Sequence, residues 1–323
     1  MPIPLDDIRA AARRIAPHLL RTPVLSARAL GERAGVSLVL KVESLQKTGS
    51  FKPRGALNLV LTLPEAKRAR GLITVSAGNH AQAVAWAARV VGVPCTVVMP
   101  ADAPRSKLEA VRGYGATVIE HGDRATLFDR LREEEARTGA AFVHPFDDPA
   151  GLAGAGTVGL ELMEQVPDLD AVIVPIGGGG LMAGVACAVK AISPRTRVIG
   201  VELAQGPGMT PALAAGKPVP VSRPKTLADG LTPPFVGAIP LEVAKRHVDE
   251  IVLVEEEAIA GGIRALLERA RLVVEGSGAA ATGALLSGRV KLAKGAKTAA
   301  IVSGGNVDPE RLVALYAGQG VAW

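Results

Sequence analysis

The stretch of residues 41–56 reads KVESLQKTGSFKPRGA, and the rest of the chain is organised around it. It begins at the end of an apolar run, residues 36–42, that predicts a β-strand. Gly49 allows a tight reversal, and Ser50, followed three residues later by a proline, signals the start of a helix. We therefore expect Lys52 in the first turn of that helix.

The position predicted for Lys52 has a chemical consequence. Unpaired N–H groups and the positive end of the helix dipole disfavour an ammonium ion there, so we expect the amine to deprotonate easily for a lysine. A deprotonated lysine is a nucleophile that forms a Schiff base with a carbonyl group. Taken alone this signal is weak, because most lysines are solvated at the surface.

The composition is that of a globular protein with a sizeable core, since 48% of the 323 residues are hydrophobic and 21% are charged. This length accommodates two domains or one large one. Aromatic residues make up only 3%, so alanine, valine and leucine must fill the core. The net charge of +6 is spread without a basic run or interleaved aromatics, so the pattern of a nucleic-acid binder is missing.

The cysteines and the apolar segments indicate a cytoplasmic protein. Cys95 and Cys187 form neither a disulfide framework nor a zinc pattern, and we expect both to be reduced core residues. Residues 1–17 have no apolar core, which argues against a signal peptide. Residues 171–189 lack charge over a length typical of a membrane span, but Pro175 and four consecutive glycines favour a strand, a loop and a helix instead.

Short apolar runs alternate with helical patterns along the chain. Alanine- and leucine-rich segments at 81–91 and 124–137 have helical periodicity. Strand and helix in alternation predict an α/β fold with mostly parallel sheets covered on both faces. The expected strands are 72–75, 95–99, 116–120, 141–144, 171–176, 197–202, 251–255 and 298–303.

A second motif, SAGNHAQ at residues 76–82, directly follows the expected strand 72–75. Small residues at the carboxyl end of a parallel strand leave backbone N–H groups free, and these can hold a carboxylate at a helix N-terminus. Asn79 adds a side-chain donor, or alternatively it simply caps the helix. Asparagine occurs only three times, at Asn58, Asn79 and Asn306, and the last two lie in glycine-bearing motifs.

A third motif is a run of four glycines after the expected strand 171–176. Their free N–H groups can surround a phosphate, and the helix that starts at Leu181 adds its dipole. The motif lacks the Lys-Ser/Thr end of a nucleotide P-loop, so a cofactor phosphate is favoured over ATP. A mere flexible turn is disfavoured, because such a run is costly in conformational entropy. The glycines are Gly177, Gly178, Gly179 and Gly180.

Residues 154–159, GAGTVG, match the Gly-x-Gly-x-x-Gly pattern of a dinucleotide-binding loop. That loop needs a preceding strand, whereas residues 147–153 contain Pro149 and Gly151 and indicate a loop or a helix start. We therefore reject the dinucleotide interpretation.

Three further phrases complete the set of motifs. IVSGGNVD at 301–308 again places small residues at the end of a strand. TLADG at 226–230 and EGSGA at 275–279 each suit a turn, with or without a capped helix after it.

Together these motifs resemble those of the threonine dehydratase and serine racemase family, the β-family of pyridoxal-phosphate enzymes. The resemblance runs over nearly the whole chain, and four motifs in the expected order are far more specific than any one. It implies fold type II, similar to the β-subunit of tryptophan synthase, with two doubly wound domains and the cofactor in the cleft between them. The large domain would be residues 1–52 plus 150–323, and the small domain residues 53–149.

The resemblance also assigns site residues. Lys52 carries pyridoxal 5′-phosphate, Asn79 contacts its 3′-oxygen, the four glycines hold its phosphate, and Ser303 hydrogen-bonds the pyridine nitrogen. A serine hydroxyl cannot keep that nitrogen protonated, so the ring is a weaker electron sink, which suits β-elimination. The other cofactor-binding positions are Phe51, Leu181, Gly230 and Glu275, and the substrate-binding positions are Ser76, Ala77, Gly78, Asn79, Phe146 and His80, the last as a structural partner rather than a base.

The activity implied is dehydration and deamination of L-threonine, and also of L-serine, to a 2-oxo acid and ammonia, with Lys52 as the general base. Serine racemase and a lyase for another 3-hydroxy amino acid stay open, as does a non-catalytic nucleotide or amino-acid sensor. The cysteine synthase branch is disfavoured, because its lysine is usually followed by aspartate and this chain has Pro53. We expect a small-molecule substrate, no nucleic-acid or membrane partner, and a homodimer or homotetramer.

Three details refine this expectation. The family's racemases carry a serine at the position of Ala77, so we expect little D-amino acid product. Their divalent-cation site begins with a glutamate like Glu202, but its following acidic residue is matched here by Gly208, so we expect weak or no metal dependence. The chain ends about fifteen residues after the Ser303 motif, so we expect no effector domain and no isoleucine inhibition.

Overall fold

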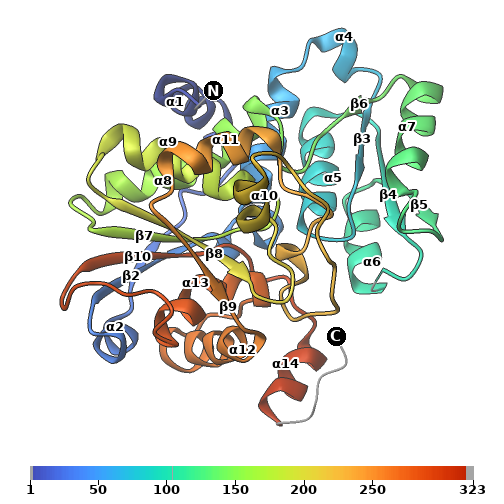
Figure 1. The fold of residues 1–323 in the computed structure, drawn as a ribbon. Coiled ribbons are helices and arrows are strands. Elements are labelled where there is room, and N and C mark those ends of the chain that lie inside the picture. Colours follow the sequence, from blue (N-terminus) through green and yellow to red (C-terminus); the bar gives the residue numbers. More distant parts are fainter. Residues whose placement is uncertain (1–2, 104, 318–323) are drawn as a thin grey trace.

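The computed structural model describes residues 3–103 and 105–317. Among these residues the strands form two separate sheets (Figure 1). The strands are β1 (Val24–Ser26), β2 (Ser37–Val42), β3 (Leu72–Val75), β4 (Cys95–Pro100), β5 (Thr117–His121), β6 (Ala141–Phe142), β7 (Ala171–Pro175), β8 (Arg197–Leu203), β9 (Glu250–Val254) and β10 (Lys297–Val302).

The six-stranded sheet has the order β1-β2-β10-β7-β8-β9, and the four-stranded sheet has the order β5-β4-β3-β6. All neighbouring strands are parallel except β1, which runs antiparallel to β2 at the edge. The α/β class with mostly parallel sheets is therefore confirmed.

Helices alternate with the strands along the chain. In the described residues they are α1 (Leu5–Ile15), α2 (Arg28–Ala34), α3 (Lys52–Thr62), α4 (Glu65–Arg68), α5 (Asn79–Val91), α6 (Arg105–Gly113), α7 (Leu127–Thr138), α8 (Pro149–Gln165), α9 (Gly180–Ile192), α10 (Met209–Ala215), α11 (Ala238–His247), α12 (Glu256–Ala265), α13 (Gly276–Leu286) and α14 (Pro309–Tyr316). Short turns of other helix types are η1 (Glu43–Leu45), η2 (Lys47–Gly49), η3 (Asp229–Leu231) and η4 (Leu266–Ala270).

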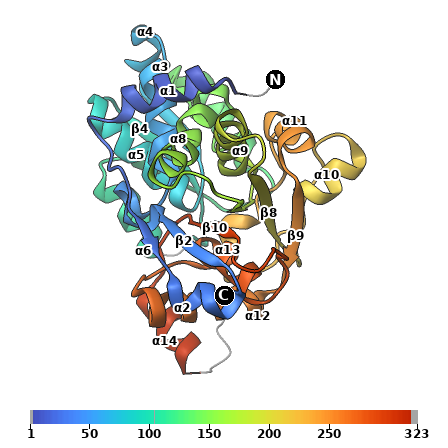
Figure 2. The same ribbon diagram turned by 90° about the vertical axis from the view of Figure 1, so that its left-hand side faces the viewer.

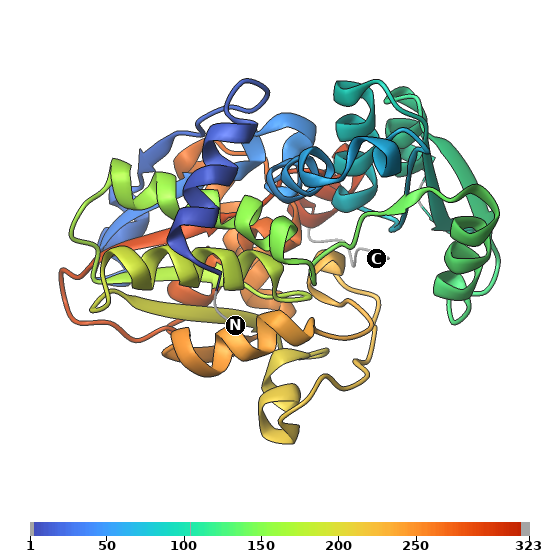
Figure 3. The same ribbon diagram turned by 90° about the horizontal axis from the view of Figure 1, so that it is seen from above.

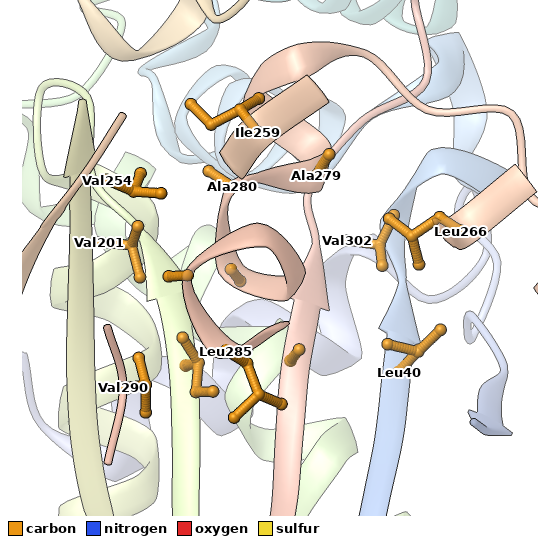
Figure 4. Packing of buried hydrophobic residues seen from close by; sticks show 14 of the residues in the cluster. Leu40, Val201, Val254, Ile259, Leu266, Ala279, Ala280, Leu285, Val290 and Val302 are labelled. Carbon is orange, nitrogen blue, oxygen red and sulfur yellow. The ribbon is translucent and has the colours of Figure 1, made fainter. Parts of the chain in front are cut away.

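The six-stranded sheet is covered on both faces. Helices α1, α8, α9 and α11 lie on one face, and α2, α12 and α13 lie on the other (Figures 1 and 2). The core is aliphatic, as the composition requires: strand residues Leu40, Val201 and Val302 pack among Ile259 and Leu285 of the covering helices (Figure 4). The hydrophobic effect therefore fixes this sheet through many small side chains instead of a few aromatic ones.

The four-stranded sheet lies beside the larger one, with α5 and α6 on one face and α7 on the other (Figure 3). Its strands come only from residues 72–142, inside the range expected for a small inserted domain. The boundaries of that domain stay a prediction, and the first of them falls in the first turn of α3. This helix packs against both α5 and α8 and so touches each side of the molecule.

Each strand expected from the sequence lies within two residues of an observed strand at both ends, whereas bounds were predicted for only two of the helices. Strand β1 was missed, because three residues, two of them half-buried and one exposed, carry no periodic signal. The expected strand 141–144 ends two residues early at Phe142, and the expected helix 124–137 begins only at Leu127. None of the helices in the described part of the chain combines the length and the apolarity needed to cross a bilayer.

A buried cluster of charges joins α3 to the sheet and to α8. The Arg54 guanidinium, 1% exposed, donates to Glu43 at 2.7 and 2.9 Å and to Glu161 at 2.8 and 2.9 Å. Lys41, with no exposed surface, donates to Glu161 at 2.7 Å and to the carbonyl of Thr22 at 2.9 Å. Two cations thus face two carboxylates, so no charge is buried without a partner.

The glycine pattern at 154–159 lies inside helix α8, so the rejection of a dinucleotide loop was correct. Its glycines serve close packing. A Cβ atom on Gly154 would lie 2.3 Å from the carbonyl oxygen of Arg54, and one on Gly156 would lie 3.0 Å from that of Gly184. Helices α3 and α9 therefore approach α8 closely because α8 lacks side chains there.

We predict that Gly154→Ala lowers the free energy of unfolding by about 1–3 kcal/mol, because the methyl group pushes α3 away from α8. Gly151→Ala on the same helix is the matched control, since its Cβ would meet nothing closer than 3.7 Å. The control should be neutral or stabilising by up to about 1 kcal/mol, as expected for alanine in a helix. Urea denaturation measures both, and equal values for the two variants would contradict this account of the packing.

Candidate active site

The order of the strands brings three of the motifs together. Strands β2, β10 and β7 are neighbours and parallel, so their carboxyl ends meet at one edge of the sheet (Figure 1). The segment that leads to Lys52 follows β2, Ser303 follows β10, and the glycine run begins after β7. Ligands of open parallel sheets bind outside this edge.

The lysine segment is fastened to the Ser303 motif by backbone contacts. The N–H of Phe51 donates to the carbonyl of Ser303 at 3.0 Å, and Ser50 forms a bridge with Gly304. Helix α3 begins at Lys52, as predicted, but Phe51 occupies the cap position and the Ser50 hydroxyl has no hydrogen-bond partner. Ser50 therefore does not cap the helix.

Lys52 is partly buried, and its amine donates to the carbonyl oxygen of Pro145 at 2.9 Å. The same nitrogen lies 5.1 Å from the ring centre of Phe51. Burial lowers the pKa of Lys52 to about 8, against an opposing effect of the charge on Glu275. The amine thus deprotonates easily, as expected, and loss of hydration is the largest cause.

Asn79 is the first residue of α5, yet its side chain does not cap the helix. Its Nδ2 donates to Glu275 Oε1 at 2.6 Å, and its Oδ1 accepts from Asn306 Nδ2 at 2.8 Å. Burial raises the pKa of Glu275 to about 8, and the charge on Asp229 adds to that effect. The capping interpretation of Asn79 is wrong, because its amide joins two other motifs instead.

Ser76 and His80 of the asparagine loop have hydrogen-bond partners of their own. The hydroxyl of Ser76 accepts from the N–H of Gly78 at 3.1 Å, with Ala77 between them. His80 is buried, and its Nε2 lies 2.9 Å from the carbonyl oxygen of Val143. Burial, with a smaller effect of the Lys52 charge, lowers the pKa of His80 to about 3. A neutral, hydrogen-bonded imidazole fits a structural partner better than a base.

The glycine run has no room for side chains. A Cβ atom would lie 2.5 Å from the carbonyl oxygen of Gly230 if placed on Gly177, and 2.3 Å from the Phe146 ring if placed on Gly178. Gly179 has a φ of +90°, and α9 starts at Gly180, followed by the buried Leu181. Among the described residues no backbone acceptor occupies the N–H groups of this loop. The loop can therefore bind an anion at the N-terminus of α9.

The five phenylalanines of the chain gather around this region. Phe51 lies beside Lys52, while Phe128, Phe235 and Phe146 form a series of ring contacts at 6.0 and 5.6 Å. His144 continues the series at 5.0 Å from Phe146 and 5.4 Å from Phe142. Of these rings, Phe51 and Phe146 line the pocket that contains the lysine amine.

Two buried hydroxyl groups at the site lack a hydrogen-bond partner. They belong to Ser50 and Ser277, and a Cβ atom on Gly230 would lie 2.7 Å from the Ser277 oxygen. The Ser303 hydroxyl, also buried, donates to the carbonyl of Ser277 at 3.3 Å. Buried polar groups left without partners are rare and suit a site that takes a polar ligand.

Glu202, the weak candidate for a metal ligand, is occupied within the protein. Its carboxylate accepts from the N–H groups of Gly208, Met209 and Thr210 at 2.6–2.9 Å and from the Thr210 hydroxyl at 2.6 Å. It therefore caps helix α10. No group of three potential metal-ligating side chains occurs in the described residues.

Two contacts of the site were not predicted from the sequence. The carbonyl of Pro145 that accepts from Lys52 belongs to a residue with no chemical signal of its own. The bond from Asn306 to Asn79 had one signal, the scarcity of asparagine, but a separation of 227 residues hides the contact.

Comparison with known proteins gives a consistent result. The model of the family described as pyridoxal-phosphate dependent enzyme matches residues 15–304. The chain is 47% identical to an L-threonine ammonia-lyase of Thermotoga maritima over 95% of this chain and 76% of that protein. It is 42% identical to the catabolic L-threonine dehydratase TdcB of Escherichia coli over 97% of this chain and 95% of that protein.

Solved structures agree with the fold. The threonine deaminase of T.th. superposes with a TM-score of 0.89 at 44% identity, covering 94% of this chain and 99% of the other. Maize serine racemase superposes with a TM-score of 0.92 at 38% identity, covering 98% of each chain.

We predict that His80 makes the protein less stable in acid. Its folded pKa of about 3 lies below the value of 6.5 for a free histidine, so the unfolded chain binds the proton more readily. The contribution of His80 to the free energy of unfolding is fully present above pH 6.5. It falls as the pH falls, by about 2 kcal/mol at pH 5. Urea denaturation at pH 5 and pH 7.5 should show that His80→Gln lacks this loss. An unchanged pH dependence, or the same change in the exposed control His18→Gln, would refute the assignment.

Proposed function

Because the chain belongs to the family of pyridoxal-phosphate-dependent enzymes, we propose that it is a lyase that dehydrates and deaminates L-threonine to 2-oxobutanoate and ammonia. The observation that carries the proposal is Lys52. Its amine has a pKa of about 8, lies in the pocket that also includes His80, Phe146 and Gly180, and points to a carbonyl that can only accept a hydrogen bond.

The residues at the sheet edge fit the cofactor. The glycine run would hold its phosphate, because four free N–H groups meet the N-terminus of α9 there. Ser303 would contact the pyridine nitrogen, and Asn79 the 3′-oxygen. When bound, pyridoxal 5′-phosphate supplies an aldehyde for the amine of Lys52 and a ring that stabilises negative charge on the substrate.

Lys52 is suited to move the Cα proton of the substrate. With a pKa of about 8, a sizeable fraction of its amine is neutral near physiological pH and can accept a proton. The Pro145 carbonyl holds this nitrogen in one position at 2.9 Å, so little orientation entropy remains to be lost. The N–H groups of Ala77 and Asn79, which have no backbone acceptor among the described residues, would bind the substrate carboxylate at the start of α5.

The walls of the pocket favour a substrate with a small apolar group. Phe146, Leu152 and Ala155 line the pocket beside Lys52. The polar side chains that also line it, those of His80, His144 and Asp148, are bonded to the backbone. Such walls suit the methyl group of threonine. L-Serine, which lacks only that methyl, is proposed as a second and poorer substrate, because one methyl group changes binding by about 1–3 kcal/mol.

We also propose a cytoplasmic homodimer or homotetramer. Both cysteines are buried and free, as suits a reducing compartment. Leu20 and Leu45 are 49% and 50% exposed, and Gln46 links their segments by bonding to the backbone of Leu20. In the proposed oligomer these two side chains would be covered by a neighbouring copy.

Two alternatives are less well supported. A racemase needs a proton-transfer group on each face of the substrate, and Ala77 offers none. A non-catalytic sensor has no need of a buried lysine whose pKa is lowered to about 8.

We predict that Lys52→Ala lowers turnover of L-threonine at least about 10⁴-fold, because one residue supplies both the nucleophile and the base. Release of 2-oxobutanoate, followed spectrophotometrically, measures the effect. Lys47→Ala changes an exposed lysine nearby and is the control, whereas Lys41 is unsuitable because it pairs with Glu161 in the core. Activity of Lys52→Ala within tenfold of wild type would end the proposal.

We predict that L-serine yields pyruvate with little D-serine, and that Ala77→Ser raises the share of D-serine, because the family's racemases carry their second proton-transfer group, a serine, at this position. Chiral chromatography of the products measures both. Ser76 is already engaged with the N–H of Gly78, so Ser76→Ala is the control and should leave the ratio unchanged. Wild-type enzyme that makes D-serine as fast as pyruvate would disprove this role of Ala77.

A further inference from the structure

A chain of hydrogen bonds joins four separate motifs through two asparagine side chains. Asn306 Nδ2 donates to the carbonyl oxygen of Thr48 at 2.7 Å and to Asn79 Oδ1 at 2.8 Å. Asn79 Nδ2 in turn donates to Glu275 Oε1 at 2.6 Å. The chain therefore runs from the lysine segment through the Ser303 motif to the asparagine loop and ends at α13.

The direction of every bond in this chain follows from its first member. A backbone carbonyl only accepts, so the group that Asn306 turns to Thr48 must be its nitrogen. The second hydrogen of that nitrogen is donated to Asn79, so the atom of Asn79 that accepts it must be the amide oxygen. The nitrogen of Asn79 is thereby turned toward Glu275 and keeps one further hydrogen for another acceptor. Thr48 thus sets the orientation of an amide in another part of the chain.

The surrounding backbone is shaped around these groups. A Cβ atom on Gly49 would lie 2.3 Å from Asn306 Oδ1, and one on Gly304 would lie 2.3 Å from Glu275 Oε1. Thr48 itself has a φ of +58°, and it is one of only three non-glycine residues with a positive φ in the described part of the chain. A β-branched residue is strained in this conformation. The strained turn at Thr48 is therefore consistent with a role in presenting its carbonyl oxygen to Asn306.

We propose that Asn306 is a positioning residue that fixes the amide of Asn79 with its nitrogen, and not its oxygen, toward the cofactor's 3′-oxygen. The proposal rests on the proposed function, in which Asn79 contacts that atom. A reversed amide would place one oxygen against another and lose the hydrogen bond. Asn306 acts through Asn79 and needs no contact with the cofactor or the substrate.

The test uses purified enzyme from which the cofactor has been removed. Pyridoxal 5′-phosphate is added back, and its binding is followed by the visible absorption of the protein. In Asn306→Asp the carboxylate cannot donate to Asn79 Oδ1, so affinity should fall about tenfold or more and the absorption maximum should shift. Asn306→Ala, which also lacks the donor, serves if the first variant does not fold. In an Asn79→Ala background the same change at Asn306 should cause no further loss, because there is no amide left to orient.

Asn58→Ala is the matched control. Asn58 is 1% exposed and also bonds a backbone carbonyl, that of Ala150 at 2.7 Å, and an arginine, Arg14 at 2.6 Å, but it lies outside the hydrogen-bond chain. It should lose stability without losing cofactor affinity.

The outcomes separate this inference from the proposed function. Asn306 variants that bind the cofactor within twofold of wild type, or a loss that is equally large in the Asn79→Ala background, would overturn the positioning role while leaving Lys52 as the nucleophile. A wild-type protein that takes up no pyridoxal 5′-phosphate would overturn both.

Discussion

The fold depends on one buried arginine. Arg54 lies two residues after Lys52. It holds the first turn of α3 against η1, directly after β2, through Glu43 and against α8 through Glu161. Removing one partner from such a cluster leaves a charge unpaired in the core and typically costs about 3–5 kcal/mol. Burial alone would lower the pKa of Arg54, but the two carboxylates raise it, so the guanidinium stays charged. This constraint on α3 also determines where the amine of Lys52 lies.

Around this anchor, the parallel strands and a few scarce residue types build the site. Three neighbouring strands end at one edge of the larger sheet, and the lysine segment, Ser303 and the glycine run follow them in the chain. The asparagine loop follows β3 of the second sheet. Four of the five phenylalanines form one series of ring contacts together with His144, and Phe51 and Phe146 line the pocket beside Lys52. Close helix packing at Gly154 then brings α3 and α8 near enough for Arg54 to reach Glu161. Helix α3 thus carries Lys52 of the site and Arg54 of the buried charge cluster, and it packs closely against Gly154 of α8.

The sequence predicted what local patterns encode. The strands, the start of α3 at Lys52 and the glycine run before α9 follow from periodicity and from glycine chemistry. What it missed depends on contacts between distant residues. The pairing of Arg54 with Glu161 spans 107 positions, and the partners of Asn79, Glu275 and Asn306, lie 196 and 227 positions away, so the sequence indicated a side-chain donor or a cap at Asn79 but not its partners. The low pKa of Lys52 was predicted in direction, but its main cause is burial, which no local pattern specifies.

The central claim is that Lys52 is the residue to which the cofactor is attached. The most direct measurement is reduction of the cofactor-loaded protein with borohydride, followed by proteolysis and mass spectrometry of the peptides. The account predicts one pyridoxyl adduct, on the peptide that contains Lys52, and none on the exposed Lys47 nearby. An adduct on a different lysine, or no adduct in a protein that binds the cofactor, would contradict it.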